Sequence, residues 1–62
     1  MAAWDAFDGY LALISERERE AIRDRVRNRR NDLLAARSEE ARVRIVADFV
    51  KEVGEILKAE RK

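Results

Sequence analysis

Apolar residues recur along most of this chain at the three- and four-residue spacing of an α-helix. The pattern is clearest over residues 39–61, where two adjacent apolar rows run along one side of the predicted helix. The first row holds Val43, Val46, Val50, Val53 and Leu57, and the second holds Ile45, Phe49 and Ile56. Together they cover roughly 160° of the helix circumference. One neighbouring helix cannot cover an arc of that width, so we expect this helix to need more than one packing partner.

Two earlier segments, residues 2–14 and 16–36, also have helical periodicity. The apolar row of the first segment consists of Trp4, Phe7, Leu11 and Ile14. Ser15 and Glu18 have the spacing of a capping box, which predicts that a new helix starts at residue 16. The first row nevertheless stays in phase with the apolar residues after Ser15, as one unbroken helix would require. The pattern leaves both alternatives open.

The last helix has a clear predicted start. Ser38 is followed by Glu39 and Glu40, which suits an N-cap with acids in the first turn, and we therefore place a turn near Arg37 and Ser38. There is no proline and there are only two glycines. Strong helix formers dominate the rest, so we expect an all-α fold, either a small helical hairpin or a three-helix bundle, completed by self-association.

The middle segment is a weak core helix, because Arg25 and Arg29 fall within its projected apolar stripe. If it pairs antiparallel with the last helix, the N-terminal row has no partner. Either the N-terminal segment folds back as a third helix, or it contacts another subunit. We predict a self-association face from the apolar rows at both ends of the chain, consisting of Trp4, Phe7, Leu11, Ile14, Ile45, Phe49 and Ile56.

Length and composition limit the kinds of functional site that the chain can form. A chain of 62 residues buries only about 60% of the surface that its unfolded form exposes, so its own core is marginal. Cysteine and histidine are absent, which excludes disulfides, thiolate or imidazole metal sites, and cysteine or histidine catalysis. The two serines, Ser15 and Ser38, both occupy predicted cap positions. We therefore expect neither an enzyme nor a bound cofactor or metal.

Arginine is concentrated in the middle of the chain. Eight of the eleven arginines lie between Arg17 and Arg37, although the formal net charge of the whole chain is only +1. Four of them project within about 80° of one another on a continuous helix and make a stripe about 16 Å long. These are Arg19, Arg23, Arg27 and Arg30. A stripe of this length could follow a phosphate backbone, so nucleic-acid binding is one hypothesis.

A solvated or protein-facing arginine surface is the more economical interpretation. Glu16/Arg19, Glu20/Arg23 and Asp24/Arg27 are opposite-charge pairs at i,i+3, and no aromatic residue is interleaved with the stripe. Arg25 and Arg29 could pair with acids of a partner chain.

The function that we expect is a non-catalytic helical interaction protein, a regulator or adaptor that acts as a homodimer or higher oligomer and could also bind another protein. No segment reaches the ~20 apolar residues of a membrane span, and the acidic start lacks the features of a targeting signal, so we expect a cytoplasmic location and no membrane partner. Five residue types are missing, which also suits a thermophile protein or a designed or selected helical bundle without natural function. These alternatives stay open.

Overall fold

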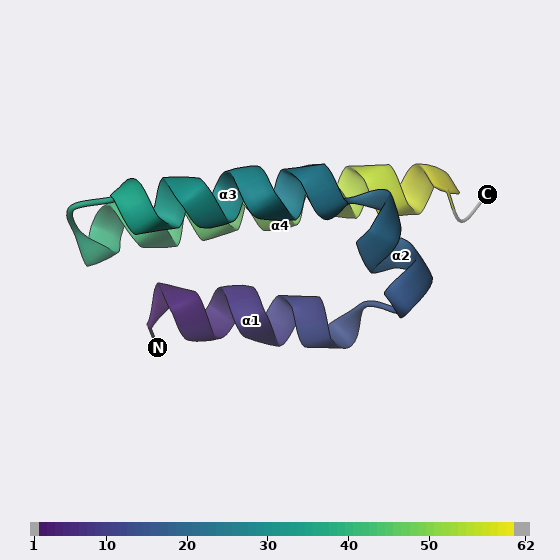
Figure 1. Cartoon of the computed structure of the whole chain (residues 1–62), viewed down its shortest axis with the longest axis horizontal. Helices are drawn as coiled ribbons and strands as arrows, with labels where there is room; N and C mark the ends of the chain where they lie inside the picture. Colours follow the sequence, from purple (N-terminus) through teal and green to yellow (C-terminus); the bar gives the residue numbers. More distant parts are fainter. Residues whose placement is uncertain (1, 61–62) are drawn as a thin grey trace.

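The computed structural model describes residues 2–60 and contains four helices in that range, α1 (Ala3–Leu13), α2 (Glu16–Ala21), α3 (Arg23–Ala35) and α4 (Glu39–Glu60) (Figure 1). No strand occurs among these residues. The predicted all-α class is confirmed.

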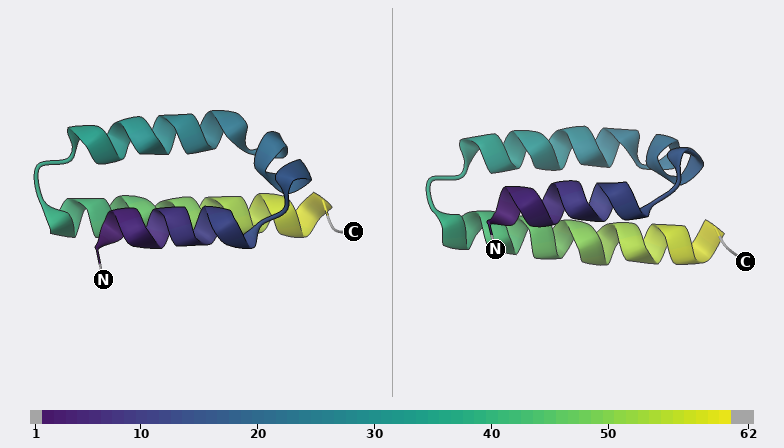
Figure 2. Two further views of the ribbon diagram at one scale, coloured as in Figure 1. Left: turned by 60° about the horizontal axis from the view of Figure 1, so that its bottom comes forward. Right: turned by 90° about the horizontal axis from the view of Figure 1, so that it is seen from below.

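The longest helix, α4, is the element on which the others pack. Both α1 and α3 lie along it, α1 running in the same direction as α4 and α3 in the opposite direction (Figures 1 and 2). The N-terminal segment therefore folds back onto its own chain. This arrangement gives α4 two neighbours, as the wide apolar arc requires.

The chain breaks after α1 because Ser15 starts a new helix. Ile14 has extended backbone angles, with φ −98° and ψ 153°. The Ser15 hydroxyl oxygen accepts a hydrogen bond from the Glu18 amide at 3.1 Å, and the Ser15 amide donates to the Glu18 carboxylate at 3.0 Å. This is the predicted capping box, and the alternative of one unbroken helix through Ser15 is wrong.

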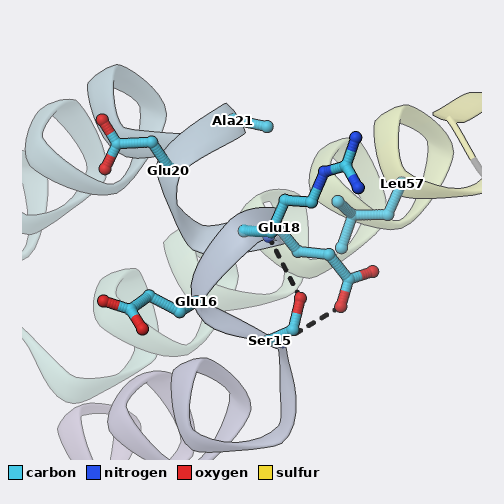
Figure 3. Close-up of a pocket in the computed structure, with 7 residues that line it drawn as sticks. Ser15, Glu16, Glu18, Glu20, Ala21 and Leu57 are labelled. Atoms are coloured by element: carbon cyan, nitrogen blue, oxygen red, sulfur yellow. Dashed lines mark hydrogen bonds between the residues drawn. The ribbon is translucent and has the colours of Figure 1, made fainter.

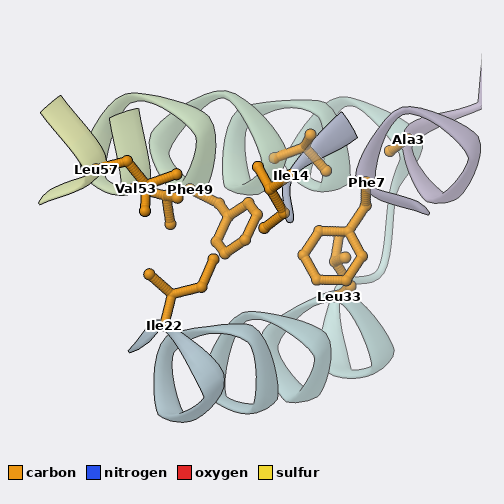
Figure 4. Close-up of a cluster of buried hydrophobic side chains, with 9 residues drawn as sticks. Ala3, Phe7, Ile14, Ile22, Leu33, Phe49, Val53 and Leu57 are labelled. Atoms are coloured by element: carbon orange, nitrogen blue, oxygen red, sulfur yellow. The ribbon is translucent and has the colours of Figure 1, made fainter. Parts of the chain in front are cut away.

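A second break, at Ile22, was not predicted. Residues 16–36 do not form one helix, because Ile22 leaves the helical region with φ −112° and ψ 15° and separates α2 from α3. The Ile22 side chain is completely buried and points toward Val53 and Leu57 of α4 (Figure 4). The break lets α2 turn across the end of the molecule while Ile22 still fills the core.

The turn between α3 and α4 lies where the sequence predicts it. Residues 36–38 are not helical, and the Ser38 hydroxyl oxygen accepts a hydrogen bond from the Ala41 amide at 3.1 Å. An N-cap of this kind satisfies one of the amides that a helix start leaves unpaired. Helix α4 is thus capped by the residue identified from the sequence.

The core lies between α1, α3 and α4 (Figure 4). Its largest fully buried side chains are Phe7, Phe49, Ile22, Leu33 and Val53. The rings of Phe7 and Phe49 lie 4.9 Å apart between centroids, and Tyr10 meets Phe49 edge to face at 5.9 Å. These contacts join α1 to α4.

Candidate functional site

The predicted self-association face is largely used inside the chain. Phe7, Ile14 and Phe49 are buried in the core. The other four members are partly buried and pack against that same core, namely Trp4, Leu11, Ile45 and Ile56. Only the exposed parts of these four side chains remain on the surface of the chain.

The arginine stripe does not lie on one straight helix. Arg19 belongs to α2, whereas Arg23, Arg27 and Arg30 belong to α3, beyond the break at Ile22. The Arg19 guanidinium donates a hydrogen bond of 2.8 Å to the backbone carbonyl of Leu11. Arg19 therefore satisfies a backbone carbonyl in the last turn of α1. The sequence had suggested that Arg19 pairs with Glu16 instead.

The three remaining members of the stripe are exposed on α3. Arg23 pairs with Glu20 at 3.5 Å and Arg27 with Asp24 at 3.7 Å, the two i,i+3 pairs predicted from their spacing. Arg30 has no ion pair within the described chain. Glu20 at the end of α2 and Asp24 at the start of α3 thus neutralise part of this surface.

Arg25 and Arg29 have a role that the sequence did not show. Arg25 donates to one oxygen of the Glu52 carboxylate at 2.9 Å, and Arg29 donates to the other at 3.0 Å. Both arginines are on α3 and Glu52 is on α4, so this three-residue cluster joins the two helices of one chain. The expected pairing with acids of a partner chain is replaced by an intramolecular one.

Within this cluster the pKa values of Glu52 and Arg29 are shifted. The hydrogen bond from Arg29 lowers the pKa of Glu52, and the charges of both arginines act in the same direction. Glu52 in turn raises the pKa of Arg29. Each group is held in its charged form, which suits a structural ion pair rather than a proton-transfer site.

Glu39 supplies a second link between helices. The amide of Ala3, at the first position of α1, donates a hydrogen bond of 2.6 Å to the Glu39 carboxylate, and Arg42 binds the other oxygen at 3.1 Å. Ala2 precedes α1 and has no side-chain oxygen to cap it. A carboxylate from α4 therefore takes the place of a local cap, and the hydrogen bond from Ala3 lowers the pKa of Glu39.

Both serine hydroxyls are engaged in helix caps. Ser15 lies at the edge of an open hollow beside α2, which is also lined by Glu16, Arg17, Glu18, Glu20, Ala21 and Leu57 (Figure 3). The Ser15 hydroxyl oxygen accepts a hydrogen bond from the Glu18 amide, and the Glu18 carboxylate accepts one from the Ser15 amide (Figure 3). Both contacts are those of an N-cap residue in a capping box.

Three large apolar side chains lie outside the core. Leu13 is 84% exposed, Leu34 is 69% exposed and Val43 is 50% exposed. The sequence placed Val43 in an apolar row of the last helix. The row's members Val46, Val53 and Leu57 are buried, whereas Val43 stays half exposed. Leu13 and Leu34 belong to none of the predicted apolar rows.

Among residues 2–60, no three carboxylates gather in a way that could hold a metal ion. None of the described helices has the length and apolar character needed to cross a bilayer. Comparison of the chain with protein-family models found no match, and comparisons with curated proteins and with solved structures found none either.

Proposed function

We propose that the protein is a small non-catalytic interaction protein, a regulator or adaptor that acts as a homodimer or higher oligomer. The observation that carries the proposal is the exposure of three large apolar side chains, Leu13, Val43 and Leu34, on a chain whose core is small. Single exposed apolar residues are common, but Leu13 and Val43 belong to neighbouring helices, α1 and α4.

The size of the chain supports the same proposal. A core of nine buried apolar side chains in residues 2–60 is small, and chains of this length commonly gain stability from association. The helices are also joined by two carboxylates of α4, Glu39 and Glu52, whose contacts are only partly buried. Association would cover the remaining apolar surface and complete a larger bundle.

The test is a mass measurement by multi-angle light scattering, with thermal melts over a hundredfold range of protein concentration. We expect a dimer or larger species at micromolar concentration and a Tm that rises with concentration, because association stabilises the folded state by mass action. A monomeric mass together with a concentration-independent Tm would contradict the proposal.

Nucleic-acid binding is a second candidate, favoured by one observation. Arg17, Arg30 and Arg37 are exposed and make no ion pair within the described residues. Of these, Arg30 shares one side of α3 with Arg23 and Arg27, and the three side chains could contact phosphates.

Salt dependence separates this candidate from protein association. If Arg23, Arg27 and Arg30 each contact a phosphate, the logarithm of the affinity for duplex DNA should fall with the logarithm of salt concentration with a slope near −2.7, at about 0.9 per contact. Replacing Arg23 and Arg27 by alanine should reduce that slope by about 1.8 and leave folding intact. Absence of binding to DNA and RNA at low salt would refute the candidate.

A further inference from the structure

The seam between α1 and α4 has an outer side that α3 does not reach. Glu52 marks the α3 side of α4, because it binds Arg25 and Arg29. Val50 projects about 160° away from Glu52 around the helix and is partly buried. Glu39, which binds the start of α1, projects within about 20° of Val50. Helix α1 therefore lies on the Val50 side of α4.

Side chains pass from the core to the surface in regular steps along this seam. On α1, Phe7 is buried, Tyr10 contacts Phe49 of α4, and Leu13 is 84% exposed. Each step of three residues turns about 60° further toward the outer side. On α4 the steps run toward the N-terminus: Val53 is buried, Val50 is partly buried and Ala47 is exposed. Each of these steps also turns about 60° toward the outer side. Leu13 and Ala47 thus lie on the same outer surface.

This surface holds no charged residue in its centre. We call it the α1/α4 face, and it consists of Gly9, Leu13, Val43, Ala47, Val50 and Gly54. A Cβ atom added to Gly9 or Gly54 would meet nothing within 4 Å among residues 2–60 beyond its own turn of helix. Glycine destabilises a helix interior, and no contact with another described element requires either one. Small residues between Leu13, Val43 and Val50 would let another helix approach closely.

The charges at the two edges of the face indicate what covers it. Beyond Gly9 the edge of α1 carries Asp5, and this helix contains two acids and no basic residue. Beyond Ala47 the edge of α4 carries Arg44 and Lys51. None of these three charges makes an ion pair within the described chain. Alongside α1, the charges nearest the face are therefore acidic on the α1 edge and basic on the α4 edge, with Asp48 and Glu55 about 40° further round α4.

We propose that a second copy of the chain binds this face about a twofold axis parallel to the helices, so that α1 of each copy packs on α4 of the other. Phe7 and Tyr10 both meet Phe49, which places Asp5 nearly level with Arg44. The twofold operation then brings Asp5 opposite Arg44 of the partner subunit, twice per dimer. An axis perpendicular to the helices would instead pack the acidic α1 against itself.

This inference rests on the proposed homo-oligomeric function and assigns its surface. The test compares Ala47→Glu with Ala59→Glu, because both alanines are exposed on α4 but Ala59 projects about 120° away from Ala47. We expect Ala47→Glu to raise the dimer dissociation constant, measured by sedimentation equilibrium, at least tenfold. Ala59→Glu should leave it unchanged, and both variants should keep wild-type helical circular dichroism.

Charge reversal tests the orientation of the copies. Asp5→Arg and Arg44→Asp should each weaken dimerisation by up to about tenfold, the effect of two exposed ion pairs, and the double variant should restore it. A wild-type oligomer whose dissociation constant is unaffected by Ala47→Glu would overturn the assignment of this face and leave oligomerisation standing. A double variant no tighter than the single ones would overturn the parallel twofold arrangement. A monomeric wild type would overturn both the face and the proposed function.

Discussion

At the scale of single residues, Phe49 is the side chain on which the core depends most. It is completely buried on α4, and its ring contacts both Phe7 and Tyr10 of α1. Paired rings at these separations add to the free energy gained from burial alone. Its position in an apolar row of the last helix was evident from the sequence, but its contacts with two aromatic side chains of the first helix were not.

Replacing Phe49 by alanine should therefore destabilise the fold strongly. We expect a loss of about 3 to 5 kcal/mol in the free energy of unfolding, because the substitution leaves a cavity and removes both ring contacts. That loss approaches the whole stability of a domain of this size. Urea denaturation followed by circular dichroism measures it. Leu34→Ala is the control, since Leu34 is 69% exposed and its loss should cost little. Equal effects of the two variants would show that Phe49 is not the centre of the core.

At the scale of helices, the caps decide where each element begins. Ser15 and Ser38 start α2 and α4 with local hydrogen bonds. The start at Ser38 was predicted from the sequence, and the start at Ser15 was one of two alternatives that the sequence left open. Helix α1 begins differently, because its first amide is bound by Glu39, 36 residues away in the chain. A cap supplied over that distance leaves no local pattern in the sequence.

The Ser15 cap should be worth a measurable part of the stability. Ser15→Ala removes the hydroxyl that accepts from Glu18 and should lower the free energy of unfolding by about 1 kcal/mol. Chemical denaturation of the variant beside Asn28→Ala gives the comparison. Asn28 is exposed within α3, where alanine is the better helix former, so its substitution should be neutral or slightly stabilising. A Ser15→Ala variant as stable as the wild type would argue against the capping box.

At the scale of the whole molecule, two carboxylates of α4 tie the other long helices to it. Glu39 binds the start of α1, and Glu52 binds Arg25 and Arg29 of α3. The pKa of each is lowered by these hydrogen bonds. The folded state therefore holds fewer protons on these groups than the unfolded state does at mildly acidic pH.

Stability should consequently decline in acid. The contribution of both carboxylates is complete above the unfolded glutamate pKa of about 4.3, and it is lost as the pH falls through their lower folded-state pKa values. Denaturation at a series of pH values from about 6 to 2 should show this loss. A variant carrying Glu39→Gln and Glu52→Gln should be less stable at pH 6 and show a shallower decline. Glu55→Gln should retain the wild-type profile, because Glu55 is exposed and makes no ion pair in the described chain. Parallel profiles for the wild type and the double variant would contradict the assignment.

The sequence by itself determined the all-α class, the cap at Ser38, the turn before α4 and the apolar rows, because each depends on residues within one or two helical turns. At Ser15 the sequence also allowed an unbroken helix, and the structure decided for the cap. Tertiary structure alone decided that the N-terminal helix returns to α4, that Ile22 interrupts the middle helix, and that Arg19, Arg25, Arg29, Glu39 and Glu52 join helices within one chain. It also decided which apolar residues stay outside the core. Periodicity identifies the apolar side of a helix, but the number and placement of its neighbours determine how much of that side is covered.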